Sequence, residues 1–475
     1  MIRRVIYLFA LTVCLTITGC VPENTNQANK NAVPSPSPSA TASPSPAEEK
    51  AANLPPLTLP VLDAFFADES FSRSLKTDLQ LTDEQVTKLK ELAHSETAKL
   101  NEENAGKGER ESSTARSEAT EKIGALIGAD KTRQLAKLVG ARWSGAANEG
   151  ADKTAQPPNA NNRAGTPNAV PTDSRIVVNA PAYRMDVFDG GRLIKSYKIG
   201  IGYPQFPLPT GLRKARVIIF NPTWTPPDEP WVAKMKGISA GEKVAAGSKL
   251  NPLGPIKIPI GGPSLIHGGK SPAKLGTFAS HGCVGLTTPQ VRDFAKMLAQ
   301  LGGAHLTDAE LADYARDKTQ TKQITLERPM PVELRYETIV VEDGKLHIYR
   351  DVYDEDTNNE ENLRAVLEAN GVRLDDLTEA ERTQVFDALA QMSGKSGAGS
   401  VGPKESPSPG PSPRSSPAEK RSNSGKKTVV KNQKEVVIEI GALKGKGYPS
   451  PVALDTGSGK TSAALSASPK RAKQP

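Results

Sequence analysis

Cysteine, histidine and aromatic residues are scarce in this chain of 475 residues. It contains three cysteines, five histidines and 5% aromatic residues, and 37% of its residues are hydrophobic. So few cysteines exclude a fold held together by a set of disulfides. The low apolar content, with 39 prolines and 40 glycines, excludes one packed core along the whole length. We therefore expect folded regions joined by segments without a core.

Long hydrophobic runs are also lacking near the N-terminus, where the apolar run from Val5 to Ile17 is too short to span a bilayer. The run follows two arginines and carries no charge, which is typical of a secretory signal. Its end, Ile17 to Cys20, resembles a bacterial lipobox, in which the cysteine is lipidated and becomes the new N-terminus. We expect residues 1–20 to be a lipoprotein signal peptide and Cys20 to anchor the protein in a membrane. An ordinary signal peptide is the alternative.

Processing at this signal leaves one free thiol. Cleavage removes Cys14 and lipid occupies Cys20, so Cys283 has no cysteine with which to form an internal disulfide. An unpaired cysteine in an exported protein is a candidate reactive thiol. Chemistry is therefore expected at Cys283.

The excess positive charge belongs to the C-terminal tail. The net charge is +8, and residues 395–475 hold 15 Lys and Arg against 5 Asp and Glu. Such a tail is either only solvated or binds a polyanion such as anionic lipid or cell-wall carboxylates. The export signal argues against nucleic acid. Residues 393–475 are rich in Ser, Pro, Gly and Lys and are expected to be disordered, with Val436 to Ile440 as either a short strand or a sticky segment.

Two further segments have the composition of linkers. Residues 21–59 are rich in Asn, Ala, Ser, Thr and Pro, and residues 147–174 in Asn, Pro and Thr, so neither can bury a core. At up to about 3 Å per residue, the first could reach on the order of 100 Å from a membrane. We interpret it as a disordered tether.

Residues 60–146 have a helical pattern. Thr82 and Gln85 predict a capping box, and the apolar residues after them share one face. A second helix is predicted from about Ala115 to Val139. The run Leu81 to Gln85 resembles the Leu-Thr-x-x-Gln motif of periplasmic stress and metal-responsive helical proteins. A capped helix of a spacer or protein-binding module is the simpler interpretation, since His94 with nearby glutamates is weak evidence for a metal.

Residues 175–330 are rich in predicted strands. The pattern predicts a strand at Arg175 to Asn179, a hairpin about Gly190-Gly191 and another strand at Arg216 to Asn221. One helix follows, with Thr288 as its cap, Pro289 at its first position and a glycine pair at its end.

Residues 331–392 are predicted to form a hairpin and two helices. The hairpin runs from Val332 to Val352 across Asp343-Gly344, and the helices lie between Glu361 and Met392. The second of these helices begins at Thr378, with Glu381 completing its cap.

Two histidines flank the free thiol in the most informative stretch of the sequence. His267 lies in Leu265-Ile-His-Gly-Gly, and Cys283 follows Ser280-His281-Gly282. A thiol with a pKa of about 8.5 is mostly protonated at neutral pH, so a nucleophilic cysteine needs an adjacent imidazole. Small residues beside it let backbone N–H groups approach a developing oxyanion.

Two other interpretations of these residues stay open. The cysteine could be structural, beside two incidental histidines. The set His267, His281 and Cys283 could bind zinc, although no fourth ligand lies at metal spacing.

The same residues resemble the L,D-transpeptidases with a YkuD-type catalytic domain. The signature of that family is a histidine, a spacer and Ser/Thr-His-Gly-Cys, matched here by His267 and Ser280 to Cys283. The similarity extends over about 175–355 and includes the stretches Pro209-Thr-Gly211, Asn221 to Pro227 and Asn251 to Gly254. It implies a mainly β catalytic domain with a β-sandwich-like fold, beside the N-terminal helical module and the disordered linkers and tail.

The resemblance also implies roles for individual residues. Cys283 would be the nucleophile, His267 the general base, and the Gly268 carbonyl the group that orients the ring. N–H groups of the turn from His281 through Gly282 to Cys283 would form the oxyanion hole. No metal or organic cofactor is implied.

The implied activity is acyl transfer on peptidoglycan stem peptides, through a thioester that an amine of another stem or of an envelope protein resolves. With water as acceptor, the same site would be a carboxypeptidase. This chain has Gly285 where the family usually carries Arg or Asn, which favours a rival function as an inactive peptidoglycan-binding lipoprotein. Sortases, another class that forms thioesters, lack Ser-His-Gly-Cys.

Overall fold

The structure, a computed structural model, describes residues 57–100, 112–143, 166–393 and 433–457. The chain divides into two units, Met1–Glu49 and Lys50–Pro475, and all described residues lie in the second. Cys20 and the predicted tether up to residue 56 lie outside them. None of the described helices is long and apolar enough to cross a membrane.

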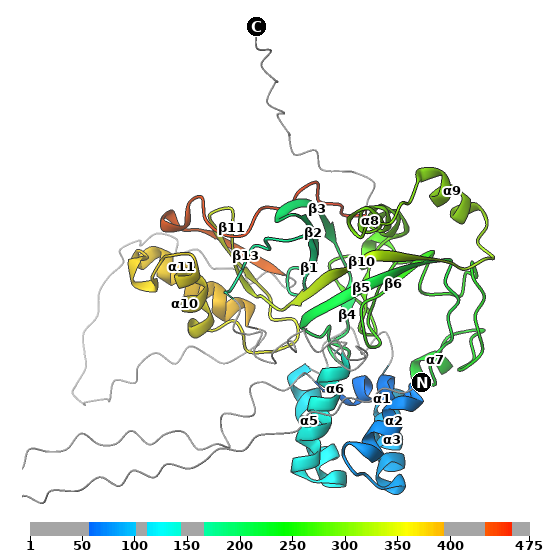
Figure 1. The fold of residues 1–475 in the computed structure, drawn as a ribbon. Helices are drawn as coiled ribbons and strands as arrows, with labels where there is room; N and C mark the ends of the chain where they lie inside the picture. The colour runs from blue at the N-terminus through cyan, green and yellow to red at the C-terminus, as the bar shows by residue number, and fades with distance from the viewer. Residues whose placement is uncertain (1–56, 101–111, 144–165, 394–432, 458–475) are drawn as a thin grey trace, which may run out of the picture. The chain divides into compact units, whose positions relative to one another are not determined.

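An N-terminal helical module precedes the β-rich region (Figure 1). Its described helices are α1 (Leu59–Phe66), α2 (Glu69–Thr77), α3 (Asp83–Ala98), α5 (Ser112–Ile127) and α6 (Ala129–Trp143). The predicted capping box is present at α3, where Thr82 and Gln85 exchange side-chain and backbone hydrogen bonds. Side chains such as Phe71, Leu89 and Ile123 are fully buried in one apolar core.

The prediction of a single second helix over about 115–139 is wrong. Two helices, α5 and α6, meet at Gly128, whose φ is +81°. Glycine adopts this left-handed conformation without the steric cost that a side chain would add. The chain can therefore break and continue in a new direction there.

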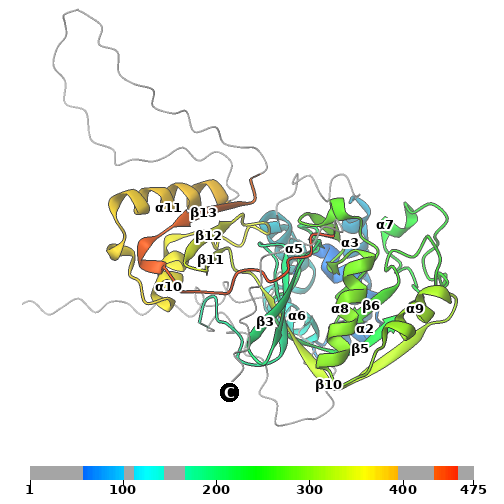
Figure 2. The ribbon, with the colours of Figure 1, turned by 90° about the horizontal axis from the view of Figure 1, so that it is seen from above.

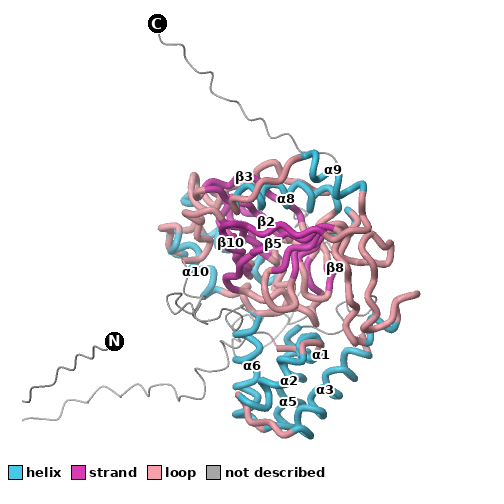
Figure 3. Tube along the Cα trace, turned by 45° about the vertical axis from the view of Figure 1, so that its right-hand side comes forward, coloured by secondary structure: helices cyan, strands magenta, loops and turns pink. Residues whose placement is uncertain are grey.

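The centre of the protein is a mainly β domain, as predicted. Within the described residues, eight strands form one sheet in the order β3-β2-β1-β10-β5-β6-β7-β9. Their bounds are β1 (Arg175–Asn179), β2 (Arg184–Asp189), β3 (Arg192–Lys198), β5 (Gly211–Phe220), β6 (Ile256–Pro259), β7 (Leu265–His267), β9 (Val284–Gly285) and β10 (Lys322–Arg335). Two short strands, β4 (Ile201–Gly202) and β8 (Phe278–Ser280), pair beside it. The strands lie together in one curved layer (Figure 3).

The two ends of this sheet meet. Gly200, just after β3, exchanges two backbone hydrogen bonds of 2.9 Å with Gly285 of β9. A strand edge closed in this way has no row of unpaired N–H and C=O groups open to other chains. The sheet is thus curled and partly closed, which fixes the position of β9.

Helix α8 (Thr288–Leu301) covers the apolar face of the sheet with its fully buried residues Val291, Phe294 and Leu298. Its cap is Thr287, not the predicted Thr288, because the Thr287 side chain accepts from Gln290 N–H in a capping box. The remaining helices of the domain are α7 (Pro230–Ala233), α9 (Asp308–Arg316) and the 3₁₀ turn Pro272–Lys274.

The predicted domain boundary at residue 330 is displaced. Strand β10 continues to Arg335 and pairs in parallel with β1, with Ile176 opposite Val332. Val332 thus belongs to the main sheet, and the predicted hairpin is shorter: β11 (Ile339–Glu342) and β12 (Lys345–Tyr349). Hydrophobic alternation runs through both elements, so it did not mark the boundary between them.

A second, smaller sheet lies beside two helices (Figure 2). It contains β11, β12 and β13 (Glu435–Glu439), which pack with α10 (Glu360–Ala369) and α11 (Glu379–Met392) around one apolar core. Thr378 and Glu381 form the predicted capping box of α11. Short 3₁₀ turns occur at Leu374–Asp376 and Gly441–Leu443.

The tail is ordered in part, which corrects the prediction of disorder for residues 393–475 and confirms the short strand that was one of two predictions for Val436 to Ile440. Strand β13 covers the open edge of β12, with Ile438 opposite Leu346. The chain then returns to the main sheet, where the Tyr448 ring packs on Phe188 at 5.7 Å and the Asp455 carbonyl accepts from Lys198 N–H. A strand edge that needs a partner thus orders a segment whose composition predicted disorder.

The end of the predicted linker 147–174 is also ordered. Asn168 is buried, and its side chain bonds to the backbone of Ile339 and Val341. An asparagine amide can satisfy one backbone donor and one backbone acceptor at once. Residues 166–174 therefore belong to the folded part of the chain.

Removing β13 should destabilise the smaller sheet. Ile438, Ile440 and Leu443 are at most 5% exposed, and burial of an aliphatic side chain contributes about 1.5–3 kcal/mol. A chain ending after residue 432 should therefore unfold at a temperature lower by several degrees or more, whereas one ending after residue 457 should match the full chain. Calorimetry of the three proteins tests this, and equal midpoints would show that β13 contributes nothing.

Candidate active site

Strands β7 and β9 bring His267 and Cys283 to one face of the sheet. The two strands pair in parallel, with Ile266 opposite Val284 and His267 opposite Gly285. Side chains alternate between faces along a strand. Ile266 and Val284 point into the apolar core, so His267 and Cys283 share the opposite face as diagonal neighbours.

The His267 ring is buried and held in one orientation. Its Nδ1 lies 2.8 Å from the Gly268 carbonyl, the contact expected from the sequence. A carbonyl only accepts, so Nδ1 donates and Nε2 keeps its lone pair. Burial, aided by the charge of Lys270, lowers the pKa of His267 to about 3, although the carbonyls of Gly268 and Leu253 oppose this. The ring is neutral at pH 7.

The Cys283 thiol is protonated in the resting site. Burial raises its pKa, while a backbone hydrogen bond at Leu265 and the charge of Lys270 lower it. The Cys283 Sγ lies 4.0 Å from the Pro263 carbonyl oxygen. The resting pair is therefore a neutral thiol and a neutral imidazole.

Ser280 holds the turn that presents the cysteine. Its hydroxyl donates to the Cys283 carbonyl at 2.6 Å and accepts from the Cys283 N–H at 3.0 Å. The Cys283 amide, expected to be an oxyanion donor, is thus already engaged with Ser280. Between them, Gly282 has a φ of +89°, a conformation that glycine adopts without strain.

The side chain of His281 is packed among aromatic rings. It stacks on Trp231 at 4.3 Å and meets Phe206 edge-on at 4.8 Å, with Tyr203 at 5.4 Å. Burial and the charge of Lys270 lower its pKa to about 3. Its ring therefore positions the turn as an uncharged aromatic group.

These aromatic partners are the functional residues that the sequence did not single out. Trp231 is not part of a recognised motif, and Tyr203 and Phe206 lie in the loop between β4 and β5. The available signal was the scarcity of aromatic residues: three tryptophans occur in the chain, and two of them, Trp224 and Trp231, stack at 6.0 Å beside this turn.

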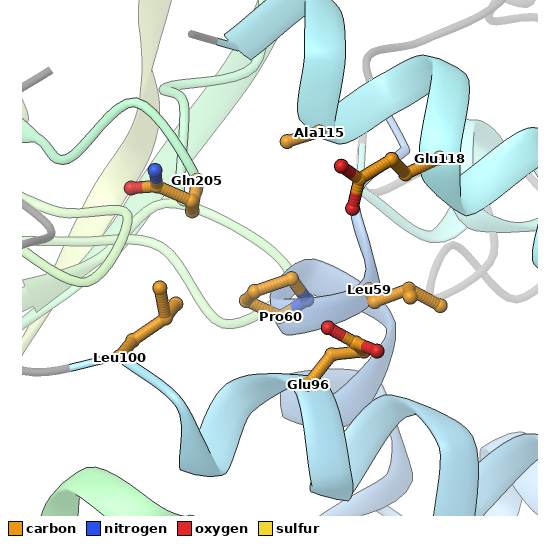
Figure 4. A pocket seen from close by; sticks show the side chains of 7 residues that line it. All are labelled: Leu59, Pro60, Glu96, Leu100, Ala115, Glu118 and Gln205. Carbon is orange, nitrogen blue, oxygen red and sulfur yellow. The ribbon is translucent and has the colours of Figure 1, made fainter. Parts of the chain in front are cut away.

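The helical module contacts the loops that hold these rings. The Thr58 hydroxyl donates to the Gln205 carbonyl at 2.6 Å, and the Ser112 hydroxyl donates to the Pro204 carbonyl at 2.5 Å. Leu100 packs with Tyr203 and Phe206. A small pocket lies beside these contacts. Figure 4 shows the residues that line it: Leu59, Pro60, Glu96, Leu100, Ala115, Glu118 and Gln205.

A second set of contacts joins the module to the other side of the site. The Lys234 ammonium donates to the carbonyls of Ala98 and Leu100 at 3.1 and 2.6 Å. The buried Trp143 indole donates to the Ser264 hydroxyl at 3.4 Å, three residues before His267. The predicted boundary between module and catalytic domain is therefore a packed interface rather than a free hinge.

Two buried acids meet at this interface. Asp63 of α1 is 3% exposed, and burial raises its pKa to about 6. Glu229 accepts from the Trp231 indole N–H, and burial together with the charge of Asp63 raises its pKa to about 7. Ionisation of this pair is thus unfavourable in the folded protein, next to the tryptophan that stacks on His281.

The residues weighed for a metal do not gather into a metal site. No group of three or more His, Cys, Asp or Glu side chains in the described ranges is placed to hold a metal ion. His94 lies instead beside Asp63, with Nδ1 at 3.6 Å from a carboxylate oxygen.

A thiol and a buried neutral histidine on one face of a curled β-sheet define a candidate cysteine-nucleophile site. Residues 173–322 match the sequence model of the YkuD family, described as the L,D-transpeptidase catalytic domain. The resemblance predicted from the sequence to the L,D-transpeptidase catalytic domain is thus confirmed for residues 173–322. No curated protein sequence matches the chain.

Solved L,D-transpeptidases are similar at low identity. The catalytic domain from E. faecium is 14% identical, with 35% of this chain and all of that chain covered and a TM-score of 0.23. The enzyme from Mycobacterium smegmatis is 14% identical over 34% of this chain and 58% of its own, with a TM-score of 0.19. An L,D-transpeptidase from Mycobacterium tuberculosis is 15% identical over 34% of this chain and 57% of its own, with a TM-score of 0.19. This chain thus spans little more than half of the two mycobacterial proteins.

The acidic interface should make stability fall as pH rises. Because the folded pKa values of Asp63 and Glu229 are raised, their ionisation costs stability progressively from about pH 4 to about pH 7. Asp63→Asn and Glu229→Gln should remove this cost and stabilise the protein by about 1–3 kcal/mol at pH 8, with little change at pH 4.5.

Denaturant unfolding at both pH values measures the difference. Glu121→Gln, at an exposed glutamate of α5, is the matched control and should change neither value. Equal stabilities of wild type and both interface variants at pH 8 would show that the acids are accommodated as carboxylates.

Proposed function

We propose that this protein is a peptidoglycan L,D-transpeptidase with Cys283 as nucleophile and His267 as general base. The observation that carries the proposal is the β7–β9 register, which presents a thiol and an oriented, neutral imidazole on one face. An imidazole with a free Nε2 lone pair can take the thiol proton as the sulfur attacks. Catalytic contacts of this kind commonly shorten only when substrate is bound.

The first step is acylation. Cys283 Sγ attacks the carbonyl carbon of the residue before a terminal D-amino acid, and its proton passes to His267 Nε2. The C–N bond then breaks, and the leaving amine takes the proton from His267. The product is a thioester on Cys283 and a free D-amino acid.

The second step transfers the acyl group. An amine from a neighbouring stem peptide or an envelope protein attacks the thioester carbonyl and gives a proton to His267. The C–S bond then breaks, and His267 returns this proton to the Cys283 sulfur. Water in place of the amine makes the same site a carboxypeptidase. The same catalytic residues support transfer to an amine and hydrolysis by water, so the reaction depends on which acceptor reaches the thioester.

The oxyanion is best served by the amides of His281 and Gly282. The third amide of the turn, that of Cys283, already donates to Ser280. Donors fixed before the reaction lower the barrier because they need no reorganisation. Ser280 then acts on the reaction by holding this turn rigid.

An inactive, peptidoglycan-binding lipoprotein is the second candidate, and Gly285 favours it. The side chain missing at that position would support substrate or the active-site loop in the family that this domain resembles. The nucleophile, the base and the group that orients the base do not include residue 285. We therefore favour a working enzyme.

We also propose that the protein is exported and held at a membrane through lipid on Cys20, facing the periplasm or cell wall. The support is the sequence from Ile17 to Cys20 after a short uncharged apolar run. Peptidoglycan lies outside the cytoplasmic membrane, so this location suits the proposed substrate.

Acylation by a carbapenem should test the thiol without a natural donor. Sγ would attack the β-lactam carbonyl, and the ring nitrogen would take the proton from His267. The wild type should gain one adduct on Cys283 by mass spectrometry. His267→Ala should react about 10²- to 10⁴-fold more slowly, the range lost with a general base.

Two controls frame this experiment. Cys283→Ala should gain no adduct, and His94→Ala, at a histidine on α3, should react like the wild type. If the wild type stays unmodified while an authentic L,D-transpeptidase reacts under the same conditions, the binding-only function is correct.

Lipidation is tested separately. Cells given a labelled fatty acid should incorporate it into the wild type and not into Cys20→Ala, whereas Cys14→Ala should label normally. Equal labelling of wild type and Cys20→Ala would exclude the anchor.

A further inference from the structure

Gly285 leaves a space that another side chain fills. A Cβ built on Gly285 would lie 2.8 Å from Cγ and 3.0 Å from Cε of Lys270. The first distance is shorter than real Cβ contacts and the second is tight, so a side chain at 285 requires the Lys270 stem to move. The stem of Lys270 thus runs across the face of Gly285.

The backbone holds Lys270 in this position. Its N–H donates to the Leu286 carbonyl at 3.0 Å, and the Leu286 N–H donates to the His267 carbonyl at 2.8 Å. These bonds extend the pairing of β7 with β9 beyond the strand ends. Lys270 is therefore anchored beside β9 by the same ladder that aligns His267 with Gly285.

The face covered by Lys270 is the face of the reacting pair. Gly285 lies directly opposite His267 and two residues after Cys283, so all three share one side of the sheet. Lys270 is partly buried there. A long stem that crosses this face brings its ammonium group into the neighbourhood of the thiol.

We propose that Lys270, which reaches over Gly285 from the loop after β7, is a positioning residue of this site and that its ammonium group stabilises the Cys283 thiolate. The inference rests on the proposed function in taking Cys283 as the nucleophile. Gly285 is then an adaptation to Lys270 rather than a sign of an inactive site.

The electrostatics of the site agree with this assignment. The charge of Lys270 lowers the pKa of Cys283 against the effect of burial, and it also lowers the pKa values of His267 and His281. A cation favours a nearby thiolate and disfavours a nearby imidazolium. Among the described residues, the charged group that acts on the Cys283 thiol is Lys270, and Glu229 is engaged with the Trp231 indole N–H.

The first experiment measures the thiol directly. The full chain is alkylated with iodoacetamide from pH 5 to 10, and modification of Cys283 is followed by peptide mass spectrometry, since only the thiolate reacts. Lys270→Met keeps the stem and removes the charge, so alkylation at pH 7 should slow about 3- to 30-fold and the profile should move to higher pH.

Two matched variants separate charge from packing. Lys270→Arg keeps the charge and should stay within about threefold of the wild type, and Lys274→Met, at an exposed lysine of the same loop, should leave the profile unchanged. A Lys270→Met profile identical to the wild type, in a protein with an unchanged unfolding temperature, would overturn the proposal.

The second experiment tests the exchange of positions. Gly285→Arg alone should lose stability and carbapenem acylation, because its Cβ meets the Lys270 stem. The double variant Lys270→Ala with Gly285→Arg should be acylated at least tenfold faster than Gly285→Arg alone. A single Gly285→Arg variant that folds and reacts like the wild type would show that Lys270 does not occupy this space.

Failure of the inference is distinguishable from failure of the proposed function. A wild type that resists the carbapenem while Lys270→Met still shifts the alkylation profile refutes the enzyme and supports the cation. A reactive wild type whose profile ignores Lys270→Met supports the enzyme and refutes the cation.

Discussion

The pairing of β7 with β9 is the constraint on which the site depends. β9 contains two residues, Val284 and Gly285, and such a strand has little stability alone. It is held by β7 on one side and by the Gly200 bridge on the other. Because a shift of one residue would move every side chain to the other face, these few backbone bonds decide whether Cys283 and His267 can meet.

Residues far along the chain secure that arrangement from outside. The helical module packs on the loop that carries Tyr203 and Phe206 and on α7, which carries Trp231, and these three rings pack around His281. The turn of the nucleophile is therefore positioned by aromatic contacts as well as by Ser280. The module supplies no candidate catalytic residue, and its connection to the site is this packing.

The sequence predicted what local rules and short motifs determine. Strand β1, the hairpin β2–β3, the capping box of α3 and the residues His267 and Cys283 with the Gly268 contact were all predicted, because periodicity, cap chemistry and a signature depend on neighbours in sequence. The short strand predicted as one of two possibilities for Val436 to Ile440 is confirmed as β13, but its partner was not predicted, because the open edge of β12 lies about 90 residues earlier in the chain. The role of Trp231 and the place of Lys270 were missed for the same reason: each follows from packing between separated segments.

Burial disfavours both charged forms of the reacting pair, and Lys270 counters this effect at Cys283 but not at His267. A buried site favours neutral forms, so it raises the pKa of the thiol and lowers that of the imidazole, and both effects oppose proton transfer from Cys283 to His267. A cation near both groups lowers both pKa values, so it gives little net bias to that transfer. It does favour the thiolate itself, and it favours any negative charge that develops when the sulfur attacks. A lysine delivered from the loop after β7 can do this without a change in the turn, whereas a side chain at residue 285 of β9 would meet the Lys270 stem.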